Sequence, residues 1–443
     1  MDKIVPQYYK EYGMYVNFKK MFPDIRDGLL PVQRRTILAA YTIAQKSFTK
    51  TAKILGEIIG KWHPHAEQLG TVQWAVQNGF LDGDGWWGTK LGSEPSSCAA
   101  ARYTNVKLSK FTYELALKYV KHVKWEPDEL DPEPIAFPTM LPFCLICKYT
   151  QSFMGFGRKT TIPVYSKNDL INRLFDKSKV IKPKIIGATC ISDAKTCRKL
   201  LESNKKVSID FRIKAYKDLK SKSVYILSSP EFTFKNVIKK LGNLWTDQQV
   251  SFIELPVPKH VSRQLKCTKD ETVCFHFTVN SKKNQDKIFQ QLCNAVDNMV
   301  FSNQYEIVVS NIESEKTEQI SVDEYLKYSY EFFSKTYIEY INYELKRIGD
   351  LKDELKIIKL LQQHLHLYKN TTKDLKTIIK ELSNKIKYSE KVILDVITKY
   401  NIKTLLTINT DVSKYDEKIQ ELRKIKKNSK EYIDNMYKNL LEL

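Results

Sequence analysis

The sequence predicts a multidomain α+β protein with three parts in chain order. Residues 1–165 carry helical patterns interrupted by proline and glycine, residues 166–321 alternate apolar and polar positions in short runs, and residues 322–443 repeat apolar residues at steps of three and four. The first pattern is typical of short helices joined by turns, the second of strands, and the third of long amphipathic helices. A chain of 443 residues can form about two to four domains of ordinary size.

Short helices dominate the predicted N-terminal part. Residues 2–22 form a tyrosine-rich helical pattern, and Pro31 opens a second one, as proline does in a first helical turn. Residues 49–61 and 66–79 predict two further helices around a break near Gly60. A helix, a tight turn and a second helix with basic and polar residues near its start resemble a helix-turn-helix.

The strongly basic composition favours a polyanionic partner, most often nucleic acid. Lysine and arginine number 72 against 51 acidic residues, which gives a net charge of +21. A general lysine-rich bias is the alternative explanation. No apolar run reaches membrane-spanning length, and the N-terminus lacks the apolar core of a secretory signal, so we expect no membrane association.

The eight cysteines fit a reducing compartment, and we expect a cytoplasmic protein. Cys144 and Cys147 form one C-x-x-C, but no second pair lies at zinc-ligand spacing. Because the surrounding run, LPFCLIC, is apolar, we interpret the pair as buried thiols and predict no metal site.

The candidate nucleophile is Tyr103, which follows Arg102 in the segment SCAAARYTNVKLSKF. A fixed guanidinium can neutralise charge on phosphoryl oxygens and favour the phenolate, so a tyrosine beside it is a plausible nucleophile toward phosphate. The chain has 25 tyrosines, and most of them must serve packing or the surface. The neighbouring motifs distinguish Tyr103 from the others.

Two pairs of residues accompany this tyrosine in the N-terminal part. Arg34 and Arg35 lie in the first turn of a predicted helix, either as a solvated basic helix start or as phosphate contacts aided by backbone amides. His63 and His65 bracket a proline. No further metal ligands are obvious near them, so we expect them to hydrogen-bond phosphate or to orient a neighbour.

A glycine-dense loop, residues 81–92, leads into the Arg102–Tyr103 segment and permits close backbone approach to a ligand. It lacks the G-x-x-x-x-G-K-[ST] pattern and is therefore not a P-loop. Lys90 lies in this loop, and Lys61 lies just before the two histidines. Both lysines are candidate DNA contacts.

The second and third parts have simpler patterns. The mixed α/β part combines strands with alternating polarity and helical stretches. The strands are predicted at residues 207–216, 223–229, 273–280 and 305–310, and the helices at 234–244 and 286–299. The last part predicts one long helix over about 322–369, shorter helices over 373–408 and a final helix over 412–443. Two long helices around a helical knob form an antiparallel hairpin, because each then buries its apolar stripe against the other.

The N-terminal motifs together carry a family resemblance. PDIRDGLLPVQRR, GKWHPH, LDGDGWWG and AAARYTNVKLSK occur in an order and spacing similar to those of the breakage-reunion subunit of type IIA DNA topoisomerases. The chain resembles the gyrase A / topoisomerase IV A family, and its short form is closest in plan to the medium subunit of T-even phage topoisomerases. The motifs lie within residues 20–111, and a weaker likeness of plan covers nearly the whole chain.

The resemblance implies a role for each matching residue. Tyr103 would attack the DNA backbone and form a 5′-phosphotyrosyl link, Arg102 would stabilise the phosphate, and His63 and His65 would lie near the scissile phosphate. Arg34 and Arg35 would contact DNA. Other positions depart from the family or match it loosely: Lys20 stands for a catalytic arginine, Leu30 for a lysine, Gln33 for a histidine of gyrases, and Met154 for an isoleucine that wedges between bases, with core filling as the alternative role of Met154.

The resemblance also implies an architecture and partners. Residues 1–165 would form a winged-helix DNA-cleavage domain, residues 166–321 a tower that cradles flanking DNA, and residues 322–443 coiled-coil arms with a dimer gate at about 373–408. The chain would act as a homodimer through the winged-helix region and the gate. Mg²⁺ and ATP would be bound by a separate protein that hydrolyses ATP and holds the metal, and the whole would form an ATP-dependent isomerase in a bacterial cell or phage-infected host.

Two other functional classes compete with this interpretation. The first is an architectural DNA-binding protein that kept the scaffold but lost cleavage, which the Leu30 and Lys20 departures favour weakly. The combined presence of Arg102, Tyr103 and the two histidines argues against it. The second is a coiled-coil scaffold that binds nucleic acid through charge alone, and it leaves the N-terminal motif set unexplained.

Overall fold

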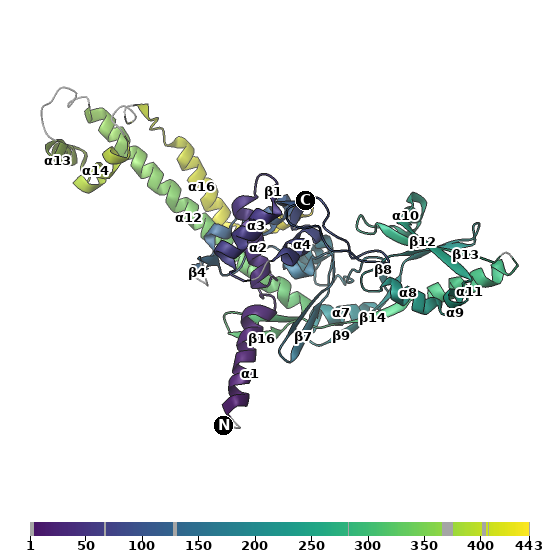
Figure 1. Ribbon diagram of the computed structural model, residues 1–443. Coiled ribbons are helices and arrows are strands. Elements are labelled where there is room, and N and C mark those ends of the chain that lie inside the picture. Colours follow the sequence, from purple (N-terminus) through teal and green to yellow (C-terminus); the bar gives the residue numbers. More distant parts are fainter. Residues whose placement is uncertain are drawn as a thin grey trace. The chain divides into compact units, whose positions relative to one another are not determined.

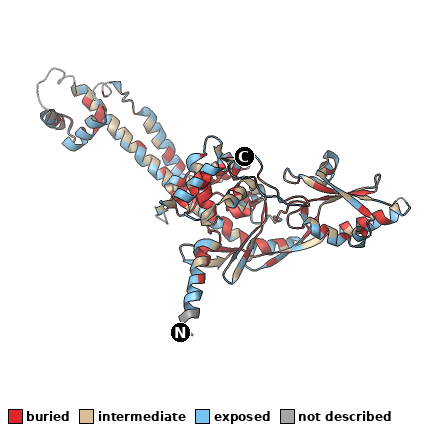
Figure 2. Ribbon diagram, in the orientation of Figure 1, coloured by how far each residue is buried: buried red, intermediate tan, exposed pale blue. Residues whose placement is uncertain are grey.

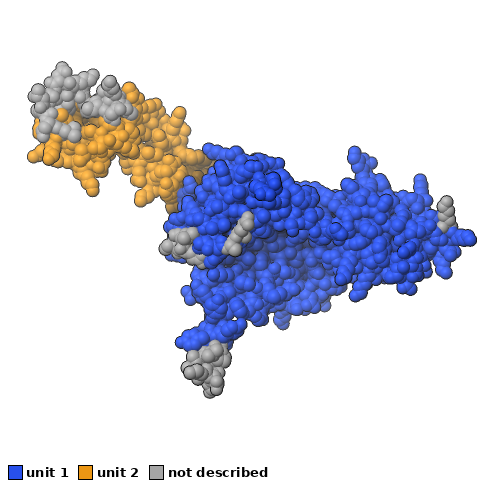
Figure 3. Space-filling view, viewed as in Figure 1, with its two compact units in different colours: residues 1–333, 437–443 blue, residues 334–436 orange. Residues whose placement is uncertain are grey.

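The computed structural model describes residues 4–65, 68–126, 131–281, 283–365, 375–400, 405 and 407–442 (Figure 1). The chain divides into two compact units, residues 1–333 with 437–443 and residues 334–436, which Figure 3 shows in blue and orange. The first unit contains both the helix-rich and the mixed α/β parts. The three-domain division with boundaries at 165 and 321 therefore stays a prediction.

The first 108 residues form short helices and a small sheet. The elements in order are α1 (Ile4–Val16), the π-helical turn η1 (Asn17–Met21), α2 (Pro31–Ile43), β1 (Thr49–Lys50), α3 (Thr51–Glu57), the π-helical turn η2 (Ile58–Trp62), α4 (Leu69–Gln77), β2 (Leu81–Asp84) and β3 (Asn105–Leu108). The strands pair antiparallel in the order β1-β3-β2. Pro31 opens α2 as predicted.

The predicted helix break at Gly60 is wrong. The helical backbone continues through Gly60 and Lys61 to Trp62, and the His63 N–H donates to the Ile58 carbonyl at 2.6 Å. Glycine in a helix costs about 1 kcal/mol, but burial of Ile58 and Trp62 on this turn contributes more. The chain therefore turns after Trp62, at the two histidines.

The described residues between 109 and 165 contain mostly short helical turns and two antiparallel strand pairs, β4 with β5 and β6 with β7. The elements are α5 (Lys110–Thr112), η3 (Tyr113–Leu117), η4 (Val120–His122), β4 (Trp125–Glu126), β5 (Glu133–Pro134), η5 (Phe143–Leu145), β6 (Gln151–Gly155) and β7 (Arg158–Ile162). Cys144 and Cys147 are buried free thiols, which confirms their interpretation. Burial raises the pKa of Cys144 to about 12.

The mixed α/β part is built on two antiparallel sheets around one apolar core. The four-stranded sheet has the order β10-β11-β13-β12 and the three-stranded sheet the order β14-β9-β8. Residues 207–213 alternate strictly between buried and exposed positions, as the sequence predicts. The elements are α6 (Lys167–Phe175), β8 (Ala188–Cys190), α7 (Ala194–Glu202), β9 (Val207–Ile213), β10 (Ala215–Asp218), β11 (Ser223–Leu227), α8 (Phe234–Leu241), α9 (Asn243–Thr246), β12 (Val250–Pro256), α10 (Lys259–Leu265), β13 (Val273–Val279), α11 (Gln285–Asp297) and β14 (Val300–Tyr305).

A final hairpin returns the chain to its N-terminal part. β15 (Val308–Asn311) pairs with β16 (Lys316–Gln319), and the Ile25 N–H donates to the Ser310 carbonyl at 2.9 Å. The long helix α12 (Val322–Leu365) follows. Figure 2 shows that α1, by contrast, is largely exposed, and its four tyrosines have 57–68% of their surface accessible.

The second unit is helical. It contains most of α12 together with α13 (Leu375–Ile386), α14 (Glu390–Lys399), α16 (Ser413–Lys427) and the first part of α17 (Ser429–Leu440). α12 and α16 lie side by side (Figure 1), and Lys352 forms an ion pair with Asp416. An apolar cluster joins α12 to α13 and α14, with Leu361, Leu382 and Ile393 at its centre.

The final helix differs from its prediction because it is interrupted at Asn428 between α16 and α17. Of the predicted gate segment, residues 373–374, 401–404 and 406 lie outside the described part of the chain. Val392 and Leu394 on α14 are partly exposed, and their role in dimerisation stays a prediction. Among the described helices, none combines the length and apolarity that a bilayer crossing requires.

Candidate active site

Tyr103 lies on a surface turn, with 64% of the residue exposed. Its backbone N–H donates to the Ala100 carbonyl at 2.9 Å, which closes the turn. The Arg102 guanidinium carbon lies 4.8 Å from the centre of the Tyr103 ring. Lys50 donates to the Arg102 carbonyl at 3.5 Å. The turn thus presents an accessible phenol beside one guanidinium, with a lysine close to its backbone.

Both ends of this turn are fixed by hydrogen bonds. On the N-terminal side the Ala99 N–H donates to the Trp86 carbonyl at 2.9 Å. On the C-terminal side the Thr51 N–H donates to the Thr104 carbonyl at 3.1 Å, and the two buried threonine hydroxyls are 2.8 Å apart. The backbone of Tyr103 is therefore held to the start of α3 and to the glycine-dense loop, although its side chain is exposed.

The glycine-dense loop needs glycine where it passes beneath Tyr103. Gly85 has a φ of +94°, and a methyl group added there would lie 2.9 Å from the Tyr103 carbonyl oxygen. The next segment is held by α4, because the amides of Gln73 and Gln77 both donate to the Trp87 carbonyl, at 3.1 and 3.0 Å. The loop predicted to approach a ligand thus approaches the backbone of the candidate nucleophile.

The histidine motif is joined to Arg35. One guanidinium nitrogen lies 2.7 Å from His63 Nδ1, and the other two donate to the Glu133 carboxylate at 2.7 and 3.1 Å. An arginine N–H can only donate, so His63 Nδ1 accepts, and the ring proton is placed on Nε2. The His65 ring stands edge-on to His63, with ring centres 4.4 Å apart.

We expect Arg35→Lys to disturb this arrangement although the charge is kept. Lysine lacks the planar fork that engages Glu133 and His63 together, so both contacts cannot persist. The loss of unfolding free energy should be about 1–3 kcal/mol. Urea unfolding checks this value, and Lys118→Arg, at an exposed lysine paired with Glu114, is the control. An Arg35→Lys protein as stable as the control would contradict the expectation.

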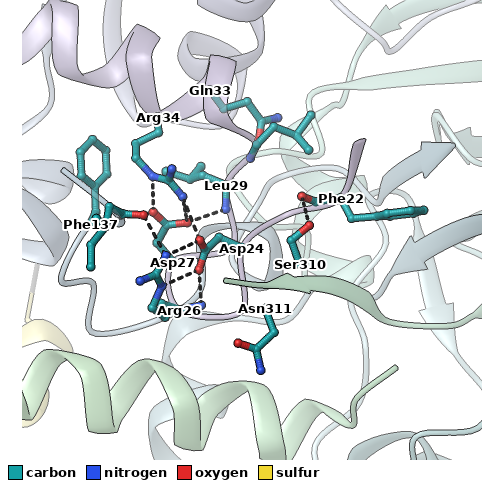
Figure 4. Close-up of polar contacts among 12 residues, drawn as sticks. Phe22, Asp24, Arg26, Asp27, Leu29, Gln33, Arg34, Phe137, Ser310 and Asn311 are labelled. Carbon is teal, nitrogen blue, oxygen red and sulfur yellow. Dashed lines mark hydrogen bonds and ion pairs between the residues drawn. The ribbon is translucent and has the colours of Figure 1, made fainter. Parts of the chain in front are cut away.

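Arg34 belongs to a buried ionic network rather than to the surface (Figure 4). Its guanidinium donates to both oxygens of Asp27, at 2.7 and 3.2 Å, and lies 3.5 Å from Asp24. Asp24 is engaged in turn by Arg26, whose Nη2 lies 2.7 Å from the carboxylate. The predicted phosphate contact of Arg34 stays a prediction, and in this structure its donors are engaged by carboxylates.

The charges of this network depend on each other. Burial raises the pKa of Asp24, but the attraction and hydrogen bonds of Arg26 outweigh it and hold the pKa below its usual value. Burial raises the pKa of Asp27, and Arg34 opposes that rise. Burial disfavours charge on Arg34 as well, yet the two aspartates hold its pKa above the usual value. The network is stable only as a set.

Lys20 and Met154 lie on neighbouring elements. Lys20 is exposed on η1, and Met154 is 66% exposed on the β6–β7 hairpin, opposite Lys159. Asn17 joins the two elements, because its side-chain amide donates to the Phe156 carbonyl at 2.9 Å and its oxygen accepts the Phe156 N–H at 2.7 Å. The exposure of Met154 argues against the core-filling role, and its role as a wedge between bases stays a prediction.

The remaining predicted residues have simpler surroundings. Lys61 lies 4.9 Å from the Trp62 ring centre, and Lys90 lies 4.7 Å from that of Tyr149. Gln33, which stands for a histidine of gyrases, accepts the Leu30 N–H at 2.9 Å and so caps α2. The structure therefore gives Gln33 a structural contact at the helix start.

Sequence reasoning missed several residues that hold the site. Asp24, Asp27, Glu133 and Thr51 were not singled out. Asp24 and Asp27 lie within a few residues of Arg26 and Arg34, but only packing buries these charges together. The partners of Glu133 and Thr51 lie 98 and 53 residues away. The Phe137 N–H that donates to Asp27 is 110 residues away. The sequence feature that could have indicated the ionic network is the mixture of acidic and basic residues in PDIRDGLLPVQRR.

Two carboxylates of β2, the strand that pairs with β3 after the Tyr103 turn, contact other side chains. Asp84 accepts from the Asn105 amide at 2.7 Å, and Asp82 lies 3.6 Å from the Lys107 ammonium. Across the described residues no group of three histidine, cysteine or acidic side chains is placed to hold a metal ion.

Comparison with known proteins identifies the family. A family model for the A subunit of DNA gyrase/topoisomerase IV matches residues 21–442. The DNA gyrase A subunit of Neisseria gonorrhoeae is 33% identical over 187 residues, which cover 39% of this chain and 20% of that protein. The DNA topoisomerase 4 A subunit of Bacillus subtilis (strain 168) is 30% identical over 190 residues, which cover 40% of this chain and 23% of that protein. The DNA gyrase A subunit of Buchnera aphidicola subsp. Acyrthosiphon pisum (strain APS) is 34% identical over 177 residues, which cover 37% of this chain and 21% of that protein.

The matched segments thus cover about a fifth of each relative's length. The family model, in contrast, covers nearly the whole chain and includes every motif around Tyr103. This chain belongs to the family of DNA gyrase/topoisomerase IV A subunits.

Proposed function

We propose that this chain is the DNA-cleaving subunit of an ATP-dependent type II DNA topoisomerase, with Tyr103 as its nucleophile. The observation that carries the proposal is an exposed tyrosine beside a guanidinium, on a turn fixed at both ends, in a member of the gyrase/topoisomerase IV family. The fixed backbone limits where the hydroxyl can lie, which favours attack on a phosphate held in one position.

The proposed reaction conserves the phosphodiester. The Tyr103 oxygen attacks a backbone phosphorus, the new bond joins tyrosine to the 5′ phosphate, and the 3′ oxygen leaves and takes up a proton. Arg102 stabilises the charge on the phosphoryl oxygens, while the His63–Arg35 pair contributes neutral and cationic donors near the phosphate. Religation is the reverse, so resealing needs no further energy source.

The domain roles follow from this proposal. The helices α2, α3 and α4 with the sheet β1-β3-β2 act as a winged-helix cleavage domain, and the mixed α/β part acts as the tower. The α12–α17 hairpin acts as coiled-coil arms with a dimer gate. Two copies cut the two strands of one duplex, a second duplex passes through, and a separate protein binds ATP and Mg²⁺. The complex works in the cytoplasm of a bacterial or phage-infected cell, on its DNA.

The test is covalent trapping with the complete complex. The chain is mixed with its ATPase and metal-binding partner, duplex DNA and Mg²⁺ or Ca²⁺, and the reaction is quenched with detergent. Protein-linked DNA whose attachment maps to Tyr103 by mass spectrometry supports the proposal. Tight DNA binding without any linkage would instead support the architectural class of function.

We expect Met154→Ala to reduce DNA bending. The exposed methionine can enter a base step and lower the cost of a kink, whereas alanine is too short to do so. The bend should fall by about 20° or more, read by energy transfer between dyes at the two duplex ends. Ser152→Ala, on the same strand of the hairpin, is the control. Equal bending by both variants would leave Met154 without this role.

A further inference from the structure

Residues 89–96 form a small hairpin, which we call the latch, where the glycine-dense loop leads into the Tyr103 turn. Thr89 and Ser96 exchange two backbone hydrogen bonds, at 3.0 and 2.9 Å, and the Thr89 hydroxyl accepts the Leu91 N–H at 3.0 Å. The latch is therefore closed at its base by paired backbone hydrogen bonds.

The tip of the latch is inserted into the mixed α/β part. Leu91 is 4% exposed and packs with Tyr149 and Ile186, with Val273 of β13 at the edge of the cluster. Burial of a leucine side chain contributes about 1.5–3 kcal/mol. This apolar contact joins a segment of the candidate cleavage region to residues that follow it by about 50 to 180 positions.

Polar contacts then fix the orientation of the tip. The Gly92 N–H donates to the hydroxyl of Ser228, which is 3% exposed, at 2.8 Å. Ser93 donates twice to the same carboxylate oxygen of Glu254 on β12, through its N–H at 2.8 Å and its hydroxyl at 2.6 Å. Hydrogen bonds to a charged acceptor are the stronger kind, and two from one residue define its direction.

The backbone conformation and the contact with Glu254 both favour glycine at position 92. Gly92 has a φ of +100°, and a methyl group added to it would lie 2.5 Å from Glu254 Oε1. A side chain at this position would therefore be strained and would also push Glu254 away. Glycine at the tip therefore avoids backbone strain and leaves Glu254 in place.

The latch is close to the nucleophile along the chain. Only residues 97–99 separate Ser96 from Ala100, the first residue of the Tyr103 turn, and a fully extended chain over this step spans at most about 14 Å. The short connecting segment can therefore take up little of any displacement of the latch, and the rest is passed on to Arg102 and Tyr103. Coupling of this kind needs contiguous contacts, and the latch supplies them.

We propose that Glu254 and Ser228 are positioning residues for Tyr103, which they hold through the latch. The mixed α/β part then sets where the phenol lies, so that DNA held by that part aligns the nucleophile with the scissile phosphate. This inference rests on the proposed function of Tyr103, because it concerns the placement of that residue for strand cleavage.

The kinetic test uses the full complex and a duplex substrate under single-turnover conditions. Glu254→Ala and Gly92→Ala should each lower the rate of covalent cleavage by about 10- to 100-fold, because small misplacements of a reacting group have effects of that size. DNA affinity should change less than about twofold, since neither residue is proposed to bind DNA. Glu254→Gln keeps an acceptor oxygen and should restore part of the rate, and Asp247→Ala, at an exposed acid of the same part, is the matched control.

Amide hydrogen exchange gives a second measurement that does not depend on cleavage. In Glu254→Ala, peptides covering 89–96 and 99–104 should both exchange faster, while melting temperature stays that of the control. Faster exchange confined to 89–96, or an unchanged cleavage rate, would overturn the coupling. If the wild-type complex forms no adduct at Tyr103, the proposed function fails, and the exchange of peptide 99–104 alone then decides whether the latch positions the turn.

Discussion

Tyr103→Phe is expected to abolish covalent linkage to DNA. Phenylalanine keeps the ring that lies 4.8 Å from the Arg102 guanidinium, so the turn and its DNA contacts should persist. The substitution removes only the oxygen that would bond to phosphorus, and loss of a nucleophile lowers the chemical rate by a factor on the order of 10⁴ or more. In a detergent-quenched trapping assay, the wild-type complex should yield protein-linked DNA, and the variant none.

The control for this experiment is another exposed tyrosine. Tyr343→Phe, at a residue of α12 that is 53% exposed, should leave both linkage and relaxation of supercoiled DNA unchanged. DNA affinity of the Tyr103→Phe complex should stay within about twofold of wild type, which separates lost chemistry from lost binding. Linkage that survives in Tyr103→Phe would mean that a different tyrosine is the nucleophile.

The largest effect on stability is expected at Asp27. Its carboxylate accepts two hydrogen bonds from Arg34 and one each from the Leu29 and Phe137 N–H groups, in a site without solvent access (Figure 4). Asp27→Ala removes both hydrogen bonds between Arg34 and Asp27 and leaves the buried guanidinium 3.5 Å from the Asp24 carboxylate. Removing one partner of a buried ion pair costs about 3–5 kcal/mol, so the variant should unfold at a much lower urea concentration.

Tryptophan fluorescence is a suitable probe of this unfolding. All six tryptophans of the chain lie in the first unit, so their signal reports on the unit that contains the network. Asp82→Ala, at an exposed acid 3.6 Å from Lys107, should cost less than about 1 kcal/mol and is the matched control.

A second arm tests whether the unpaired charge is the cause. Adding Arg34→Met to Asp27→Ala removes that charge. The double variant should lose less unfolding free energy than the two single variants lose in sum. If Asp27→Ala cost no more than the control, the network would not be the structural centre of this region.

Local patterns predicted much of this protein. Pro31 marks the first turn of α2, the alternation over 207–213 marks β9, and three-four spacing marks α12, because each depends on residues within a few positions of one another. The chemistry of Arg102 beside Tyr103 is local in the same sense, and the structure places the two side chains in contact on an exposed turn.

Predictions from local patterns were wrong where the burial of side chains outweighed the conformational preference of a single residue. Gly60 did not end its helix, because Ile58 and Trp62 bury their side chains by continuing the turn. Arg34 looked like a surface cation because its position at the start of a helix does not reveal its pairing with Asp27. Asp27 lies in the loop before the helix, and its carboxylate also accepts the Phe137 N–H. Whether a charge is solvated or paired depends on neighbours that helix periodicity does not encode.

The sequence by itself therefore determined the element types, the family and the candidate nucleophile, since these depend on adjacent residues. Tertiary structure decided which charges are buried as pairs, because burial depends on the segments packed around them. It also decided how the Tyr103 turn is held, because contacts such as that between Thr51 and Thr104 join residues far apart in the chain. Ser93 meets Glu254 across 161 positions and Tyr325 donates to the Asp24 carbonyl across 301. Such pairs form only when the packed core brings their segments together, and no local pattern specifies them.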